Sequence, residues 1–213
     1  MEKLARKLAS NIAISLDYNK EREQIVAYGL IAIIQTLITV FLGLIIGLFA
    51  GVPIEALIIC FSVNILRKYS GGAHAGSIEL CTSVAVIYII TFSLISRYLL
   101  SGVLNSYIMA IIIFIVYALS YLLIYKLAPV DSPKKLIKTD KKKKRMRKGS
   151  FTILTICFTV SIILFLLSQK KYISYSLGLS LLFGLSWQVF TLTKPGSSFI
   201  HLIDSAVSKI VRI

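Results

Sequence analysis

The stretch IVAYGLIAIIQTLITVFLGLIIGLFA, residues 25–50, contains no charged side chain. It is longer than the roughly 17–25 apolar residues with which a helix crosses the hydrocarbon core of a bilayer. Because a charge-free run of this length has no counterpart in ordinary soluble helices, the stretch predicts a transmembrane helix.

Five more apolar runs follow, at residues 52–66, 80–100, 107–127, 151–168 and 172–192. The chain of 213 residues is 57% apolar and 15% charged, whereas soluble domains are roughly 45–50% apolar and 25% charged. The run at 52–66 is the shortest and carries Pro53, Glu55 and Asn64, so it predicts a short, tilted or partly re-entrant helix. We expect one all-α polytopic membrane domain, residues 1–213, with about six transmembrane helices in residues 25–192.

Amphipathic patterns flank these runs at both ends, in residues 1–24 and 193–213. At the first end, leucine and isoleucine recur every four residues between basic side chains: Leu4, Leu8, Ile12 and Leu16. At the second, apolar residues follow a three-to-four spacing: Phe199, Leu202, Ile203, Ala206, Val207, Ile210 and Val211. Both patterns predict helices lying flat on the membrane, although packing against protein loops would give the same pattern.

The basic residues are distributed unevenly between the predicted connections. Between Lys126 and Lys148 there are eleven basic residues and two acids, while residues 51–53 and 101–106 carry no basic residue. The positive-inside rule therefore places both termini and a basic loop, residues 126–150, in the cytoplasm. The run at 141–148 lies between two spans, which favours attraction to anionic lipid or docking of an acidic peptide over binding of nucleic acid.

The segment RKYSGGAHAGSIELC, residues 67–81, places His74 and Cys81 seven positions apart at the start of a span. On one continuous helix they would be separated by about 10.5 Å along the axis, too far for proton transfer. The segment must therefore fold back. Three glycines supply the conformational freedom: Gly71, Gly72 and Gly76.

Within this segment, Ser77 has the position and chemistry of a helix N-cap, which places Cys81 about one turn into the next span. Positive charge from Arg67 and from the helix N-terminus would favour a thiolate, the reactive form of cysteine. A catalytic pair and a merely structural histidine and cysteine both fit this pattern, and Arg67 could simply extend to the interface. A zinc site is not expected, because it needs at least three protein ligands, and the chain would have to recruit His201 or a buried cysteine from another span.

Arg67, Gly71-Gly72, His74 and Cys81, followed after two spans by the sequence APVD at 128–131 and a basic loop, resemble the accessory gene regulator protein B (AgrB) family. The resemblance extends over nearly the whole chain. It implies a cysteine endopeptidase of the bacterial cell membrane whose active site faces the cytoplasm and which matures a quorum-sensing propeptide. In that case Cys81 is the nucleophile and His74 the base, and no cofactor is needed. Five further residues would hold the substrate or the oxyanion, or support the catalytic pair: Arg67, Gly71, Gly72, Ser77 and Asp131.

The implied reaction begins with attack of Cys81 on a peptide bond of the precursor, which leaves an acyl-thioester that the retained peptide can close into a ring. The implied partner is a peptide precursor with an amphipathic N-terminus and an acidic tail. We expect the tail to dock on five basic residues: Lys141, Lys142, Lys143, Lys144 and Arg145. Anionic lipid is a second partner, nucleic acid is not expected, and a homodimer is left open. The family often has Asn-Arg-Pro after the aspartate, whereas this chain reads SPKK at 132–135, which leaves substrate selectivity undetermined.

Two other functions fit parts of the sequence. In a small transporter of the peptide, Asn64, Glu55 and Arg97 would line a path through the membrane. In a non-catalytic scaffold, the basic loop would bind an acidic partner. Replacing Cys81 with alanine separates these readings from a peptidase, because only a peptidase needs the thiol.

Overall fold

The computed structural model describes the chain except for residues 1, 74, 102–104, 131–138, 169–171 and 212–213. Over this part the protein consists of helices and loops, with no β-strand. The helices are α1 (Glu2–Ser15), α2 (Lys20–Phe49), α3 (Pro53–Ser70), α4 (Ile78–Leu94), the π-helix η1 (Ile95–Leu100), α5 (Ser106–Leu127), α6 (Asp140–Ser168), α7 (Tyr172–Phe190) and α8 (Lys194–Val211).

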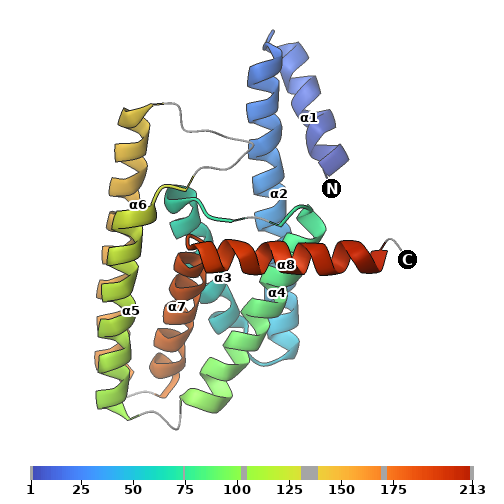
Figure 1. The fold of residues 1–213 in the computed structure, drawn as a ribbon. Helices are drawn as coiled ribbons and strands as arrows, with labels where there is room; N and C mark the ends of the chain where they lie inside the picture. Colours follow the sequence, from blue (N-terminus) through green and yellow to red (C-terminus); the bar gives the residue numbers. More distant parts are fainter. Residues whose placement is uncertain (1, 74, 102–104, 131–138, 169–171, 212–213) are drawn as a thin grey trace.

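Helices α2 to α7 form an antiparallel bundle in which successive helices run in opposite directions (Figure 1). The α3–α4 loop, the end of α5, the start of α6 and the α7–α8 turn consequently lie at one end of the bundle. This alternation agrees with the topology expected from the apolar runs. It gathers onto one end the segments that carry the predicted site.

In the part of the chain that the structure describes, four helical segments are long and apolar enough to cross a membrane: α2, α4 with η1, α5 and α6. The pair α7 and α8 meets the same criterion only together, and it is bent by 86°. The polytopic all-α class is therefore confirmed, while length and composition alone give four to five spans instead of about six. Helix α3 accounts for the difference, because its 18 residues span only about 27 Å and include Glu55, Arg67 and Lys68.

The short length and the charged residues of α3 have a structural reason, since α3 and α7 are the inner helices of the bundle. Helix α3 packs most extensively on α7 and also contacts α2, α4 and α6. Ile59 and Leu66 of α3 and Leu185 of α7 are completely buried. A helix that is surrounded by protein does not need the uniformly apolar surface that lipid requires, so α3 can carry polar residues.

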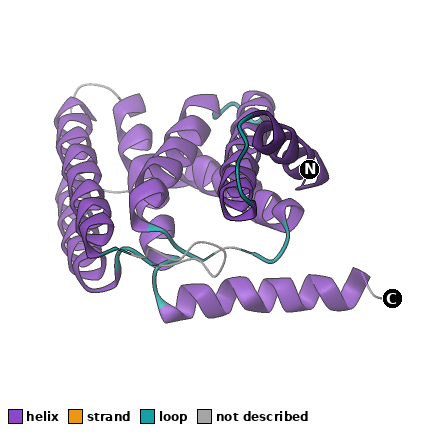
Figure 2. Ribbon diagram, turned by 90° about the horizontal axis from the view of Figure 1, so that it is seen from above, coloured by secondary structure: helices purple, strands orange, loops and turns teal. Residues whose placement is uncertain are grey.

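The two terminal helices are arranged differently from each other. Helix α8 runs roughly perpendicular to the bundle helices (Figure 1) and lies along one side of the bundle (Figure 2). Helix α1 instead packs along the first half of α2 (Figure 1), which differs from the flat orientation that we expected. The reason is a second stripe with the same spacing, because Ala5, Ala9 and Ala13 are buried and allow close approach, while Leu4 and Leu8 remain exposed.

The basic segment also differs from its prediction as part of a loop over residues 126–150. Helix α6 begins at Asp140, so the basic residues at 141–145 lie on its first turns. Lysine and arginine are good helix formers, and an acidic residue in the first turn complements the helix dipole. The connection between α5 and α6 is correspondingly shorter than predicted.

Candidate functional site

The loop between α3 and α4 reverses direction at two glycines. Gly71 and Gly72 have φ values of 71° and 138°, which favour glycine over residues with a side chain. A Cβ atom on Gly71 would also collide with the carbonyl oxygen of Val130. The predicted need for glycine is therefore confirmed at both positions.

The end of α7 holds this loop through a buried glutamine. The side chain of Gln188 donates one hydrogen bond to the Gly71 carbonyl at 2.7 Å and another to the Ser70 hydroxyl at 3.0 Å. Val130 donates its N–H to the Ser70 carbonyl at 2.9 Å from the other side. The last turn of α3 and the first loop residue are thereby fixed by two separate parts of the chain.

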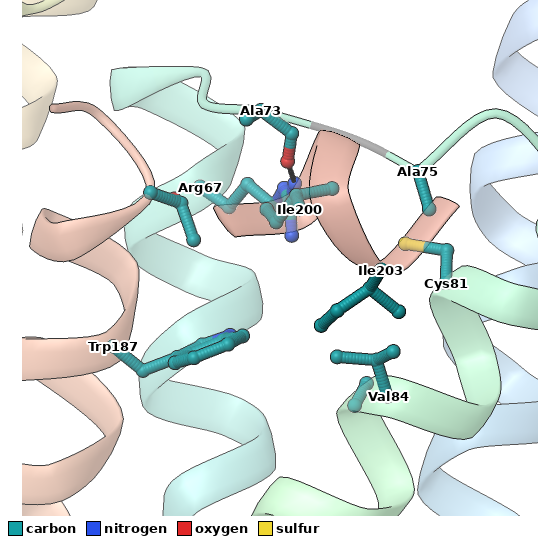
Figure 3. A pocket seen from close by; sticks show the side chains of 10 residues that line it. Arg67, Ala73, Ala75, Cys81, Val84, Trp187, Ile200 and Ile203 are labelled. Carbon is teal, nitrogen blue, oxygen red and sulfur yellow. Dashed lines mark hydrogen bonds between the residues drawn. The ribbon is translucent and has the colours of Figure 1, made fainter. Parts of the chain in front are cut away.

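Ala73 is held by both of its backbone groups. Its N–H donates to the Thr191 carbonyl at 3.1 Å, and its carbonyl accepts from the guanidinium of Arg67 (Figure 3). Arg67 therefore supports the loop, in addition to carrying charge. His74 follows directly in the sequence and lies outside the described residues.

Ser77 caps α4 as predicted. Its hydroxyl accepts a hydrogen bond from the Leu80 N–H at 3.2 Å, and the Cys81 N–H donates to the Ser77 carbonyl at 3.1 Å. Cys81 thus lies in the first turn of α4, where the helix N-terminus favours negative charge.

The Cys81 thiol lies beside a small cavity of about 30 Å³ at this end of the bundle (Figure 3). The cavity is mainly apolar and has walls from α3, the α3–α4 loop, α4, α7 and α8. Its lining residues are Arg67, Ala73, Ala75, Cys81, Val84, Ala85, Trp187, Thr191, Ile200 and Ile203. Arg67 and Cys81 are close enough to interact electrostatically, so a thiolate here would face a fixed positive charge within an apolar enclosure.

Other residues predicted for the site are not among those that line this cavity. The Gly71 N–H already donates to the Arg67 carbonyl at 3.0 Å, so it is engaged in capping α3 and would need to be released to bind an oxyanion. Asp131 lies outside the described residues. Residues 141–145 are on α6, which contributes no residue to the lining of this cavity.

Sequence reasoning missed the contribution of α7 and α8. Gln188 is fully buried, and a glutamine within the apolar run 172–192 is a signal that we could have used, because polar residues at membrane depth tend to be functional. Asp204 of α8 accepts a hydrogen bond from the Gly76 N–H at 2.8 Å. Nothing in the local sequence around Asp204 points to the loop that it contacts.

Comparisons with known proteins identify the family of the chain. The sequence model of the family Accessory gene regulator B matches residues 1–192. The chain is 38% identical to AgrB-like protein 2 of Clostridium perfringens strain 13 (Type A), over 99% of this chain and 100% of that protein. It is also 38% identical, with the same coverage, to an AgrB-like protein of strain SM101 of the same species. No solved structure matches the chain. The chain therefore belongs to the Accessory gene regulator B family of membrane proteins.

Proposed function

We propose that this protein is a membrane-embedded cysteine endopeptidase that removes the C-terminal tail of an autoinducing-peptide precursor. The observation that carries the proposal is the cavity that Cys81 shares with Arg67, Ala73 and Ala75. Ala73 and Ala75 are the sequence neighbours of His74 on either side. A thiol, a guanidinium and the loop that contains a histidine are therefore associated with one apolar enclosure.

The chemistry follows from these groups. The Cys81 thiolate attacks the carbonyl carbon of the scissile bond, and the bond to the tail nitrogen breaks as His74 gives that nitrogen a proton. The retained peptide remains on Cys81 as a thioester. A thiol or hydroxyl of that peptide then gives its proton to the now neutral His74, attacks the thioester carbonyl and closes a thiolactone or lactone ring, as the bond to the Cys81 sulfur breaks and the sulfur leaves as a thiolate.

Two features of the site support such a reaction. The N-terminal turn of α4, which carries Cys81, directs its positive dipole end to the place where negative charge would develop on the oxyanion. The apolar lining, including Val84, Trp187 and Ile203, would limit access of water to the thioester. Ring closure would then compete effectively with hydrolysis.

The proposed location is the cell membrane of a bacterium, with this end of the bundle and both termini on the cytoplasmic side. The basic first turns of α6 are at the same end of the bundle as the α3–α4 loop (Figure 1), as the positive-inside rule requires of a cytoplasmic end. We assign their lysines to anionic lipid and to the acidic tail of the precursor. No particular observation favours a transporter: Glu55 accepts hydrogen bonds from Arg97 at 3.0 Å and Ser176 at 2.8 Å.

The proposal is tested by co-expression with a candidate propeptide, taken from a short open reading frame sought next to the gene. We expect Cys81→Ala and His74→Ala to leave the propeptide at full length, because each removes a reacting group. Cys60→Ala and Cys157→Ala are matched controls that remove thiols outside the cavity and should still process it. Mass spectrometry of the peptide distinguishes the outcomes, and normal processing by the Cys81→Ala variant would exclude a cysteine peptidase.

A further inference from the structure

Helix α8 forms one wall of the cavity beside Cys81. Ile200 and Ile203 line the cavity (Figure 3), and Ile200 is only 8% exposed. The match to the family model ends at residue 192, two positions before α8 begins. This wall is therefore built by a part of the chain that the family description does not include.

Helix α8 is fixed firmly where it begins. The Thr193 hydroxyl accepts a hydrogen bond from the Gly196 N–H at 3.1 Å. Phe199 packs edge-on against Trp187 and Phe190, with ring centroids 6.5 and 6.1 Å apart. These contacts join the start of α8 to the end of α7 and define a pivot.

Farther along, α8 is held only lightly. Among the described residues it makes no extensive contact with another helix, and Leu202 is 68% exposed. One polar contact in this farther part of α8 is the hydrogen bond from the Gly76 N–H to the Asp204 carboxylate. Segments with few packing contacts open at low free-energy cost, so α8 can move about its pivot while the bundle stays intact.

The size of the cavity favours such a movement. A volume of about 30 Å³ has room for about two water molecules. Cys81 itself is partly exposed, but a large side chain at the cleaved position would not fit beside it while Ile200 and Ile203 remain in place. Of the walls around the cavity, α8 is the one that lacks extensive packing against the other helices.

We propose that α8 is a hinged wall of the peptidase site that determines which residue can donate the scissile carbonyl. It moves outward to admit the precursor and then closes, packing Ile200 and Ile203 against an apolar side chain at the cleaved position. Asp204 is a positioning residue, because its carboxylate holds the closed helix to the α3–α4 loop through Gly76. The selectivity part of this proposal rests on the proposed peptidase function, whereas the movement of α8 does not.

Alkylation of Cys81 tests the movement without any substrate. In a Cys60→Ala/Cys157→Ala background Cys81 is the single thiol, and its rate of reaction with N-ethylmaleimide should rise when α8 moves away from the cavity. We expect Asp204→Ala to raise that rate at least about tenfold, as loss of one hydrogen bond to a charged group predicts. Asp204→Asn keeps an acceptor oxygen and should raise the rate less than Asp204→Ala. Leu202→Ala alters an exposed side chain of the same helix and should stay within about twofold of the parental rate.

An Asp204→Ala rate equal to the parental rate, in correctly inserted protein, would overturn the hinged wall. Equal acceleration by Leu202→Ala would overturn it too, because the effect would then reflect general loosening of α8. Since this assay needs no cleavage, its result stands even if the protein proves not to be a peptidase.

Selectivity is tested with propeptides that carry leucine or tryptophan at the cleaved position. Ile203→Ala enlarges the cavity, so the ratio of kcat/KM for tryptophan to that for leucine should rise at least about tenfold, since small volume changes in apolar pockets discriminate to this degree. Leu202→Ala should leave the ratio unchanged. If Ile203→Ala lowered both values in proportion, α8 would have no role in selectivity. If the parental protein cleaved neither these propeptides nor the unaltered one, the proposed function itself would fail.

Discussion

Gly71 is constrained by groups from three parts of the chain: α3, α7 and the segment that follows α5. Its N–H donates to Arg67, its carbonyl accepts from Gln188, and the carbonyl of Val130 occupies the space that a side chain would need. Its φ of 71° and ψ of −152° lie in a region populated essentially by glycine, where other residues are strained by about 1–3 kcal/mol. The path of the α3–α4 loop therefore depends on this residue.

We expect Gly71→Ala to abolish or strongly reduce propeptide processing, because the loop that carries His74 must move away from Val130. Gly29→Ala is the control, since a Cβ atom there would have no neighbour within 4 Å and alanine favours the helix. Processing assays on inserted protein compare the two variants. Parental activity in Gly71→Ala would show that the loop conformation is not required.

The positions of Ser77, Gly71 and Gly72 could be predicted because their roles depend on local backbone geometry. The contacts of Gln188 with Gly71 and of Asp204 with Gly76 could not, since they join residues 117 and 128 positions apart. Such pairs depend on how α7 and α8 return to the α3–α4 loop. No local pattern contains that information.

Helices α3 and α7 approach each other closely at Gly184. A Cβ atom at this position would collide with the Ser62 hydroxyl and lie 3.0 Å from the Ile59 carbonyl oxygen. Small residues let membrane helices approach each other in this way. The contact matters for the site because α3 and α7 carry Arg67 and Gln188 at the same end of the bundle.

Gly184→Ala should lower the free energy of unfolding by about 1–3 kcal/mol, the usual cost of overpacking. Gly178→Ala on the same helix should be tolerated, since a Cβ atom there would be at ordinary contact distances of 3.6 Å or more. Thermal denaturation in detergent measures the difference. Equal stability of the two variants would show that the α3–α7 contact is not tight at Gly184.

The helix boundaries show where the sequence pattern was incomplete. Apolar length predicted α2, α5 and the membrane part of α6 well, because these helices need a lipid-compatible surface. It underestimated α3, because Arg67 and Lys68 end the apolar run at 52–66 while the helix itself continues to Ser70. It also missed the first turns of α6, where a run of lysines has no hydrophobic periodicity from which a helix could be inferred.

The alternating bundle predicts that Lys141 and Asn105 lie on opposite sides of the membrane. In a background without the native cysteines, Asn105→Cys should react with an impermeant thiol reagent in intact cells, and Lys141→Cys should react only after lysis. Both native residues are exposed, so accessibility within the protein does not bias the comparison. Labelling of Lys141→Cys alone would invert the orientation.

The basic first turns of α6 should contribute to recognition of an acidic precursor tail. Replacing Lys141, Lys142, Lys143 and Lys144 with glutamine should weaken processing most at low salt. The difference from the parental protein should shrink as salt rises, because exposed charges are screened within about 8 Å at physiological ionic strength. Insertion must be verified first, and a variant that processes at the parental rate at low salt would restrict these lysines to membrane anchoring.

The most direct test of the account uses purified protein in lipid vesicles with a synthetic propeptide and no other protein. We predict release of the C-terminal tail, together with a hydroxylamine-sensitive adduct on Cys81 whose mass equals that of the retained peptide as a thioester. The Cys81→Ala variant should show neither. Tail release by Cys81→Ala at the parental rate would contradict the assignment of Cys81 as the nucleophile of a membrane endopeptidase.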